Sequence, residues 1–396
     1  MQFADRLNNV ETSAIRELFK LLGKPGIISF AGGFPDSAMF DVEGIRAASN
    51  AALAEEPGAA LQYGATEGYN PLREQLAAFM TAKGATDVAA DNLIVTTGSQ
   101  QALDLLGKTL VSPGDKVIVE GPTFLATIQC FRLYGAELIS APIDGNGVKT
   151  DELEKLIAEH KPKFVYLIPT FGNPSGAMLS LERRKAVLEM AVKHNTLIVE
   201  DDPYGDLYFG DAPPPSLLNL SATVPGSRDL LVHCGSLSKV LSPGLRIGWL
   251  VAPPPIMDKL VIAKQAADLH TNALAQRILH RFLTDNDLDA HIATIIRAYG
   301  RQKEAMIAAI RDHFPAGVQC TDPEGGMFLW VTLPEGMSSM ALFDAAIRKK
   351  VAFVPGTPFY VDRKDSNTLR LNFSCSDEPT IVEGIRRLGT SIKELS

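Results

Sequence analysis

The sequence predicts an α/β protein with a mainly parallel sheet and a second, smaller α+β lobe. From about residue 90 to 255, short apolar runs alternate with helical stretches, which is the pattern of parallel α/β sheets. Beyond about residue 285 the pattern changes to one long helical stretch followed by separated strand-like runs. A chain of 396 residues is also too long for one ordinary core and suits two lobes.

Six apolar runs in the first part are candidate strands: Asn92–Thr96, Lys116–Glu120, Phe164–Ile168, Thr196–Glu200, Leu230–Cys234 and Ile247–Val251. We expect one helix between Glu137 and Lys163 and another over Leu181–His194. In the second part, a helix is expected near Ile292–Arg311, followed by strands in MFLWVTLP, VAFVPG and LRLNFS.

We expect the N-terminal segment to belong to the smaller lobe and not to the large sheet. After Thr12 and Ser13, apolar residues recur at helical spacing up to Leu22, which predicts an amphipathic helix. Paired glycines and a proline then force a loop within Ile27–Phe40. We therefore expect an arm and part of the small domain at 1–45, a large domain at 46–285 and a small domain at 286–396.

Composition excludes several classes of protein. The net charge of −8 and the lack of a basic block argue against a nucleic-acid partner. The four cysteines lie far apart, which fits neither a metal site nor a disulfide framework. No apolar run is long enough to cross a bilayer, and the charged start is unlike a signal peptide. We expect a cytoplasmic protein without membrane contact and without a metal.

Four polar or glycine-rich segments directly follow predicted strands: Thr97–Gln100, Thr170–Gly176, Asp201–Tyr204 and Gly235–Lys239. In doubly wound sheets, ligands bind just beyond the carboxyl ends of the strands. The four segments are therefore expected at one edge, where they would form a site.

A phosphate is one ligand that this edge could hold. The segment Thr97–Gln101 opens a helix, and the free N–H groups at a helix start bind phosphate, so Ser99 and Gln100 are candidates. Helix capping alone would explain the same residues.

Lys239 is the strongest candidate for covalent chemistry. It follows an apolar strand, where burial would lower its pKa and free the amine to attack a carbonyl. Ser236, Ser238 and Arg246 lie close in sequence and suit a phosphate. The alternative is an ordinary surface lysine.

Ser-x-Ser-Lys followed by Pro-Gly-Leu-Arg-Ile-Gly, at 236–248, resembles the cofactor-lysine signature of class I/II aminotransferases, which depend on pyridoxal 5′-phosphate (PLP). Further motifs agree in order: Tyr63-Gly64, Glu67-Gly68-Tyr69, Leu72-Arg73, Gly98 to Gln101, Asn173 to Gly176, Asp201 to Tyr204 and Arg370. The nearest resemblance is to the branch of 2-aminoadipate, kynurenine and aromatic aminotransferases and the effector domains of MocR-type regulators. It implies PLP fold type I, with a mainly parallel seven-stranded sheet in the large domain.

The resemblance assigns roles at the cofactor. Lys239 would hold PLP as a Schiff base and then carry the proton between substrate and cofactor. Asp201 would pair with the pyridine nitrogen, whereas Asp202 is expected only to cap a turn. Asn173 and Tyr204 would hydrogen-bond the phenolic oxygen, and Asn173 would also face the substrate.

The remaining implied roles concern stacking, substrate and partner. Phe124 would stack on the ring, although a lone Phe beside a helix is usually core. Arg370 would grip the substrate α-carboxylate in a bidentate pair, unless it merely faces solvent from its strand. Gly33, next to Gly32, would belong to a segment that closes over substrate. Tyr63 would reach the phosphate of the neighbouring subunit, which implies a homodimer with shared sites.

The function implied is ping-pong transfer of an amino group from an L-amino acid to a 2-oxo acid, with 2-oxoglutarate as the expected acceptor. A PLP lyase or synthase on the same scaffold is the alternative, since the cofactor can direct several bond cleavages. A DNA-binding regulator is disfavoured, because only about forty residues precede the cofactor-domain motifs and they resemble the aminotransferase arm.

Overall fold

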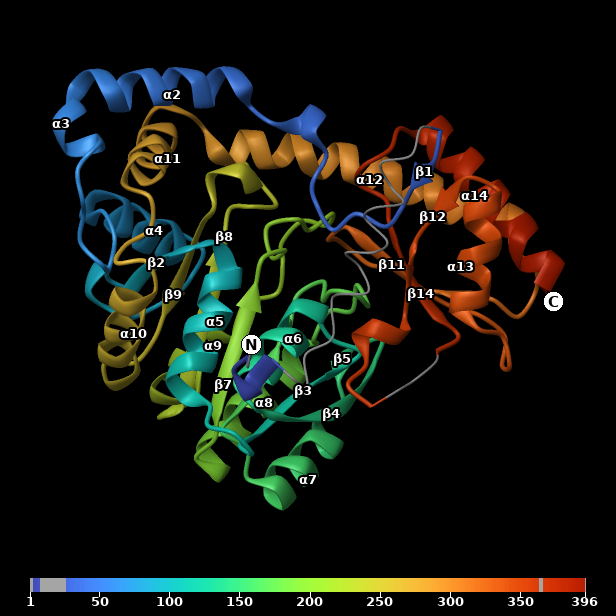
Figure 1. Ribbon diagram of the computed structural model, residues 1–396, viewed down its shortest axis with the longest axis horizontal. Helices are drawn as coiled ribbons and strands as arrows, with labels where there is room; N and C mark the ends of the chain where they lie inside the picture. The colour runs from blue at the N-terminus through green and yellow to red at the C-terminus, as the bar shows by residue number, and fades with distance from the viewer. Residues whose placement is uncertain (1–2, 8–25, 363–365, 396) are drawn as a thin grey trace.

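The computed structural model describes residues 3–7, 26–362 and 366–395. Its centre is an eight-stranded sheet in the order β2-β9-β8-β7-β6-β3-β4-β5 (Figure 1). The strands are β2 (Leu93–Thr97), β3 (Lys116–Gly121), β4 (Glu137–Asp144), β5 (Gly147–Val148), β6 (Phe164–Leu167), β7 (Leu197–Asp202), β8 (Leu231–Ser236) and β9 (Ile247–Val251). β9 and β5 run antiparallel to their neighbours, and the other strands share one direction.

The six strands expected from sequence are all present as β2, β3, β6, β7, β8 and β9. The seven-stranded sheet implied by the resemblance corresponds to the strands of four or more residues. β5 adds an eighth strand, because the chain turns back after Asp144 and pairs for two residues with the end of β4.

One expectation was incomplete. The segment 137–163, in which only a helix was expected, begins with β4 and continues into the helix α7 (Thr150–His160). Of the eight β4 residues only Ala141 is buried, so the strand lacks the continuous apolar run that marked the other strands. Its parallel pairing with β3 along Lys116–Gly121 fixes it in the sheet.

Helices cover the sheet and position its loops. They are α2 (Val42–Glu55), α3 (Pro57–Ala60), α4 (Asn70–Ala82), α5 (Gly98–Leu110), α6 (Leu125–Leu133), α8 (Leu181–His194), α9 (Leu217–Leu220), α10 (Pro254–Ala267) and α11 (Ala273–Asp285). Side-chain caps start several of them: Ser180 Oγ accepts from Arg183 N at α8, and Asn272 caps α11. The expected helix 181–194 is α8 itself.

The C-terminal part forms a separate antiparallel sheet, in the order β10-β11-β14-β13. Its elements are α12 (Leu288–His313), β10 (Gln319–Cys320), β11 (Phe328–Thr332), α13 (Ser339–Arg348), β12 (Val351–Ala352), β13 (Val354–Pro355), β14 (Thr368–Asn372) and α14 (Glu378–Leu395). Figure 1 shows α12 running from α11 towards β11, β14 and α14. The long helix and the three strand-like runs expected here are confirmed.

The N-terminal segment joins this C-terminal part. β1 (Ile28–Ser29) pairs in parallel with β12, and Phe30 O accepts from Asn372 N of β14 at 2.8 Å. The loop after β1 is thereby held against the C-terminal sheet. The amphipathic helix expected at Thr12–Leu22 lies outside the described residues. Among the helices that the structure describes, none has the length and apolar character needed to cross a membrane.

Candidate active site

A cavity of about 270 Å³ lies at the carboxyl ends of the central strands. Eight residues predicted from sequence line it: Gly33, Ser99, Phe124, Asn173, Asp201, Tyr204, Lys239 and Arg370. They come from the loop after β1, the start of α5, the end of β7, the loops that follow β3, β6, β7 and β8, and the strand β14. Segments from both sheets therefore meet at one cavity.

Lys239 sits in the turn after β8, with its amine in this cavity. Its Nζ donates to Gly33 O at 2.8 Å, and no carboxylate of the described residues pairs with it. Burial, with the nearby positive charges of Arg370 and Arg246, lowers the pKa of Lys239 to about 8. A substantial fraction of the amine is therefore neutral near physiological pH, which is what a nucleophilic lysine requires.

Asp201, near the end of β7, is the acidic group of the cavity and is only 2% exposed. Its Oδ2 accepts a hydrogen bond of 2.6 Å from Tyr166 Oη. Its Oδ1 is buried and has no hydrogen-bond partner in the described part of the chain. Burial raises the pKa of Asp201 to about 6. A buried carboxylate oxygen without a partner costs free energy unless a ligand donates to it.

Arg370 does not face solvent, because every residue of β14 is buried and Arg370 itself is 3% exposed. Its Nη1 donates to Asn173 Oδ1 at 2.7 Å and its Nη2 to Ala31 O at 2.9 Å. The guanidinium lies 4.3 Å from the ring centroid of Phe328. Its Nε has no partner, and no carboxylate pairs with it in the ranges that the structure describes. Burial lowers the pKa of Arg370 to about 10, yet it stays charged near neutral pH. Such a cation suits an anionic ligand.

Two aromatic side chains complete the cavity walls. Tyr204 is 4% exposed, and its ring centroid lies 6.0 Å from Lys239 Nζ. Burial raises the pKa of Tyr204, so its phenol is protonated at neutral pH. Phe124 is the residue before α6; it is partly buried against the core and also lines the cavity.

Close backbone packing brings the expected phosphate residues together. Ser236 pairs with Gly248 across β8 and β9, and a Cβ at Gly248 would lie 2.8 Å from Ser99 N. Gly98 has a φ of +72°, and a Cβ there would crowd the Arg246 guanidinium. Only glycine lets these segments approach. The start of α5, the end of β8 and the Arg246 side chain thus form one polar cup.

Ser238 also belongs to this cup, since Ser236 Oγ donates to Ser238 Oγ at 2.8 Å. Five predicted residues do not line this cavity: Ser236, Ser238 and Arg246, which form the cup, and the exposed Gln100 and Tyr63. Gln100 is exposed on α5, and Tyr63 is 79% exposed, with its ring against the edge of His270.

Asp202 faces away from Asp201, as alternation along a strand requires. Its Oδ1 accepts from Gly205 N at 3.0 Å, so it caps a turn as expected. It lines a larger cavity of about 540 Å³ together with His233 and Ser236. Size alone therefore does not locate the site, because most of the predicted residues gather in the smaller cavity.

Two buried groups beside Asp201 were not predicted from the sequence. One is Tyr166 of β6, and the other is the pair in which Glu200 Oε2 and His233 Nδ1 lie 2.8 Å apart. Burial lowers the pKa of His233, but the bond and charge of Glu200 outweigh it, so the net direction is upward. Tyr166 and His233 lie inside the apolar strands β6 and β8, where no local pattern marks them, and Glu200 lies on β7 directly before Asp201. Among the described residues, no three His, Cys, Asp or Glu side chains gather as a metal site would require.

Comparisons with known proteins agree with this geometry. The family model for aminotransferase class I and II matches residues 26–388. The chain is 42% identical to aromatic-amino-acid aminotransferase 1 of Thermococcus litoralis over 99% of this chain and 94% of that protein. Two solved structures each cover 99% of this chain and 97% of their own: the Thermus thermophilus α-aminoadipate aminotransferase complexed with N-(5′-phosphopyridoxyl)-L-leucine (41% identity, TM-score 0.92) and the Pyrococcus horikoshii kynurenine aminotransferase (42%, 0.94).

The family match spans both sheets and includes every residue of the cavity. The fold, the cavity residues and the relatives matched over nearly their full length agree, and the chain belongs to the class I and II aminotransferases.

Proposed function

We propose that this enzyme transfers an amino group from an L-amino acid to a 2-oxo acid with PLP as its cofactor, by a ping-pong mechanism. The observation that carries the proposal is one cavity that brings together the Lys239 amine and two buried groups without a hydrogen-bond partner among the described residues, Asp201 Oδ1 and Arg370 Nε. The Thermus relative was solved with a phosphopyridoxyl–amino acid adduct, which supports the same cofactor here.

The residues fit this cofactor. Asp201 Oδ1 is a buried acceptor that would take a hydrogen bond from the ring N–H. Asn173 and Tyr204 line the same cavity and would hydrogen-bond the phenolic oxygen. Phe124 supplies a ring for stacking. The phosphate would be held by the cup of Ser99, Ser236, Ser238 and Arg246, where helix N–H groups and a guanidinium favour an anion.

PLP, when bound, supplies an aldehyde carbon that accepts an amine and a ring that withdraws electrons from the substrate α-carbon. Lys239 would provide the amine that holds the cofactor and would take up and return the substrate α-proton, because its lowered pKa leaves part of the amine neutral and able to accept a proton. Arg370 holds the substrate carboxylate and so orients the α-carbon towards Lys239. Asn173 Oδ1 accepts a hydrogen bond from Arg370 Nη1 and so keeps the guanidinium in place.

The second lobe would close over substrate. Gly33 O already meets Lys239 Nζ, and a Cβ at Gly33 would lie 3.7 Å from Arg370 Nη2. Closure of this loop would exclude water around the reacting atoms. We place the large domain at 46–285, with 1–45 and 286–396 contributing to the small domain.

We also propose a homodimer with shared sites. Tyr63 is a large, exposed aromatic outside the cavity of its own chain, and its position suits contact with the phosphate region of a second copy, because exposed aromatic side chains favour interfaces. Gln100, in the first turn of α5, stays a candidate for the phosphate of its own chain.

Half-reactions test the proposal. Each of a panel of acidic, aromatic and branched L-amino acids is mixed with the holoenzyme, and the change in cofactor absorption is followed. Adding 2-oxoglutarate alone should then restore the starting spectrum. If no amino acid converts the cofactor reversibly, or if the donor loses a side-chain or carboxyl group instead, the enzyme is a lyase or synthase on this scaffold.

A further inference from the structure

We infer that Tyr166 is a positioning residue for Asp201: its phenol fixes Asp201 Oδ2 and leaves Oδ1 directed to the cofactor ring nitrogen. This inference rests on the proposed function, in which Asp201 faces that nitrogen.

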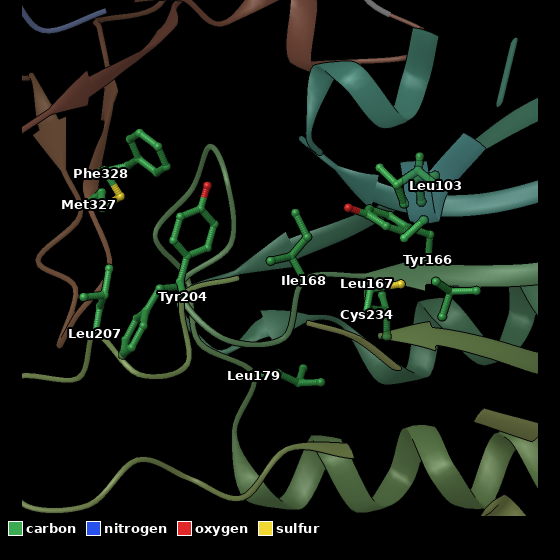
Figure 2. Close-up of a cluster of buried hydrophobic side chains, with 14 of the residues drawn as sticks. Leu103, Tyr166, Leu167, Ile168, Leu179, Tyr204, Leu207, Cys234, Met327 and Phe328 are labelled. Atoms are coloured by element: carbon green, nitrogen blue, oxygen red, sulfur yellow. The ribbon is translucent and has the colours of Figure 1, made fainter. Parts of the chain in front are cut away.

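The two residues come from neighbouring parallel strands. Tyr166 on β6 pairs with Val199 on β7, so Asp201 lies two residues further towards the cavity. Figure 2 shows Tyr166 in a cluster of buried side chains that includes Leu103, Leu167 and Cys234. Tyr166 is fully buried and does not line the cavity. Its hydroxyl therefore acts on the site through Asp201 and not by touching a ligand.

The bond from Tyr166 Oη to Asp201 Oδ2 is 2.6 Å long, within the range of hydroxyl-to-carboxylate bonds. Burial, then the Asp201 charge and hydrogen bond, raises the pKa of Tyr166 well above its ordinary value. The phenol therefore remains protonated and is the donor. Since each carboxylate oxygen needs a donor when buried, the bond at Oδ2 leaves only Oδ1 unsatisfied.

The bond also acts on the charge of Asp201. Burial raises the pKa of this carboxyl, whereas donation from Tyr166 lowers it. An ionised Asp201 attracts a protonated ring nitrogen, but a neutral carboxylic acid does not. Loss of the Tyr166 hydroxyl would leave Oδ2 buried without a donor and would favour the neutral acid.

Tyr166 also packs as an aromatic ring, with its centroid 6.0 Å from that of Phe131. A purely structural role would depend on this ring and not on the hydroxyl. Tyr166→Phe separates the two roles, because phenylalanine keeps the ring and removes only the oxygen. Tyr134→Phe is a matched control, since Tyr134 Oη donates to Asp104 Oδ1 at 2.7 Å and neither residue lines the cavity.

The experiment measures binding to the apoprotein of PLP and of 1-deazapyridoxal 5′-phosphate, in which a C–H replaces the ring nitrogen. Tyr166→Phe should weaken PLP binding roughly ten- to a hundred-fold, the effect of removing a hydrogen bond to a charged group. Binding of the deaza analogue should change less than about two-fold, because it makes no bond to Asp201. Tyr134→Phe should leave both affinities unchanged. In an Asp201→Ala background, Tyr166→Phe should have no further effect.

Equal weakening of both cofactors by Tyr166→Phe would show a structural role and overturn the inference. Unchanged PLP binding in Tyr166→Phe, with a clear loss in Asp201→Ala, would overturn the role of Tyr166 alone. If Asp201→Ala itself left PLP binding unchanged, the pairing of Asp201 with the ring nitrogen in the proposed function would fail as well.

Discussion

Replacement of Arg370 by lysine tests how the cavity recognises substrate. The change keeps a positive charge but removes the planar fork that can bind both carboxylate oxygens at once. Nη1 and Nη2 of Arg370 donate to Asn173 Oδ1 and Ala31 O, while its Nε has no partner among the described residues. A lysine ammonium at this position would lose this fixed arrangement and its contact with the Phe328 ring.

The size of the effect follows from burial. Arg370 is 3% exposed, so a carboxylate bound to it is shielded from water and the pair is not a surface ion pair. Disrupting a buried, hydrogen-bonded charge pair costs about 2–5 kcal/mol, or roughly thirty- to several-thousand-fold in binding. Because every amino donor and every 2-oxo acceptor carries the α-carboxylate, all of them should weaken alike.

Stopped-flow half-reactions with acidic, aromatic and branched donors, and with several 2-oxo acids, measure this directly. Arg183→Lys is the control: Arg183 binds Asp144 with bonds of 2.7 and 2.8 Å at a position outside the cavity. The control should react like the parent enzyme, and the cofactor should stay attached to Lys239 in both variants. Near-normal kinetics of Arg370→Lys, or a loss restricted to acidic donors, would refute the role of Arg370 as the general carboxylate anchor.

Three further outcomes are expected. Lys239→Ala should lose turnover and the visible absorption of the attached cofactor, although PLP can still bind noncovalently, as an absorption spectrum and a phosphate assay would show; retained turnover would exclude Lys239. Asp201→Ala should keep the fold but react far more slowly, whereas Asp202→Ala, which loses only a turn hydrogen bond, should do much less harm; equal losses at equal PLP content would contradict this. The rate at which the apoprotein attaches PLP should rise with pH with a midpoint near 8, because only the neutral amine of Lys239 attacks; a midpoint at the ordinary lysine value of 10.5 would show that burial does not lower its pKa.

Much of the fold could be predicted because its strands are continuous apolar runs. β6 and β9 are buried at every residue, so their signal is strong. β4 was missed because it lies near the edge of the sheet and buries only Ala141, which leaves a mixed pattern. A partly exposed strand of this kind is specified by pairing with its neighbours, which sequence periodicity does not reveal.

Some cavity residues could be placed from the sequence and others could not. Ser99, Asp201 and Lys239 follow predicted strands, so the topology of a doubly wound sheet already places them at one edge. Arg370 comes from the other lobe, and its sequence context is equally compatible with a solvent-facing side chain. Only the packing of β14 between β11 and β13 shows that it is buried.

Tyr166 could not be found from sequence because its role depends on a contact between strands. In the run Phe164–Leu167 it looks like any other core aromatic residue. Its hydroxyl matters only because it donates a hydrogen bond to Asp201 of β7. Tyr63 presents the opposite case: its exposure in one chain is clear, but its proposed role needs a second copy.

Peptide mapping after reduction decides whether Lys239 carries the cofactor. The holoenzyme is reduced with borohydride, digested, and its peptides are mapped by mass spectrometry. We expect one phosphopyridoxyl group, on the peptide that contains Lys239 and on no other lysine. A label on Lys264, which is also buried, or on any lysine other than Lys239 would contradict the assignment on which the proposed function rests.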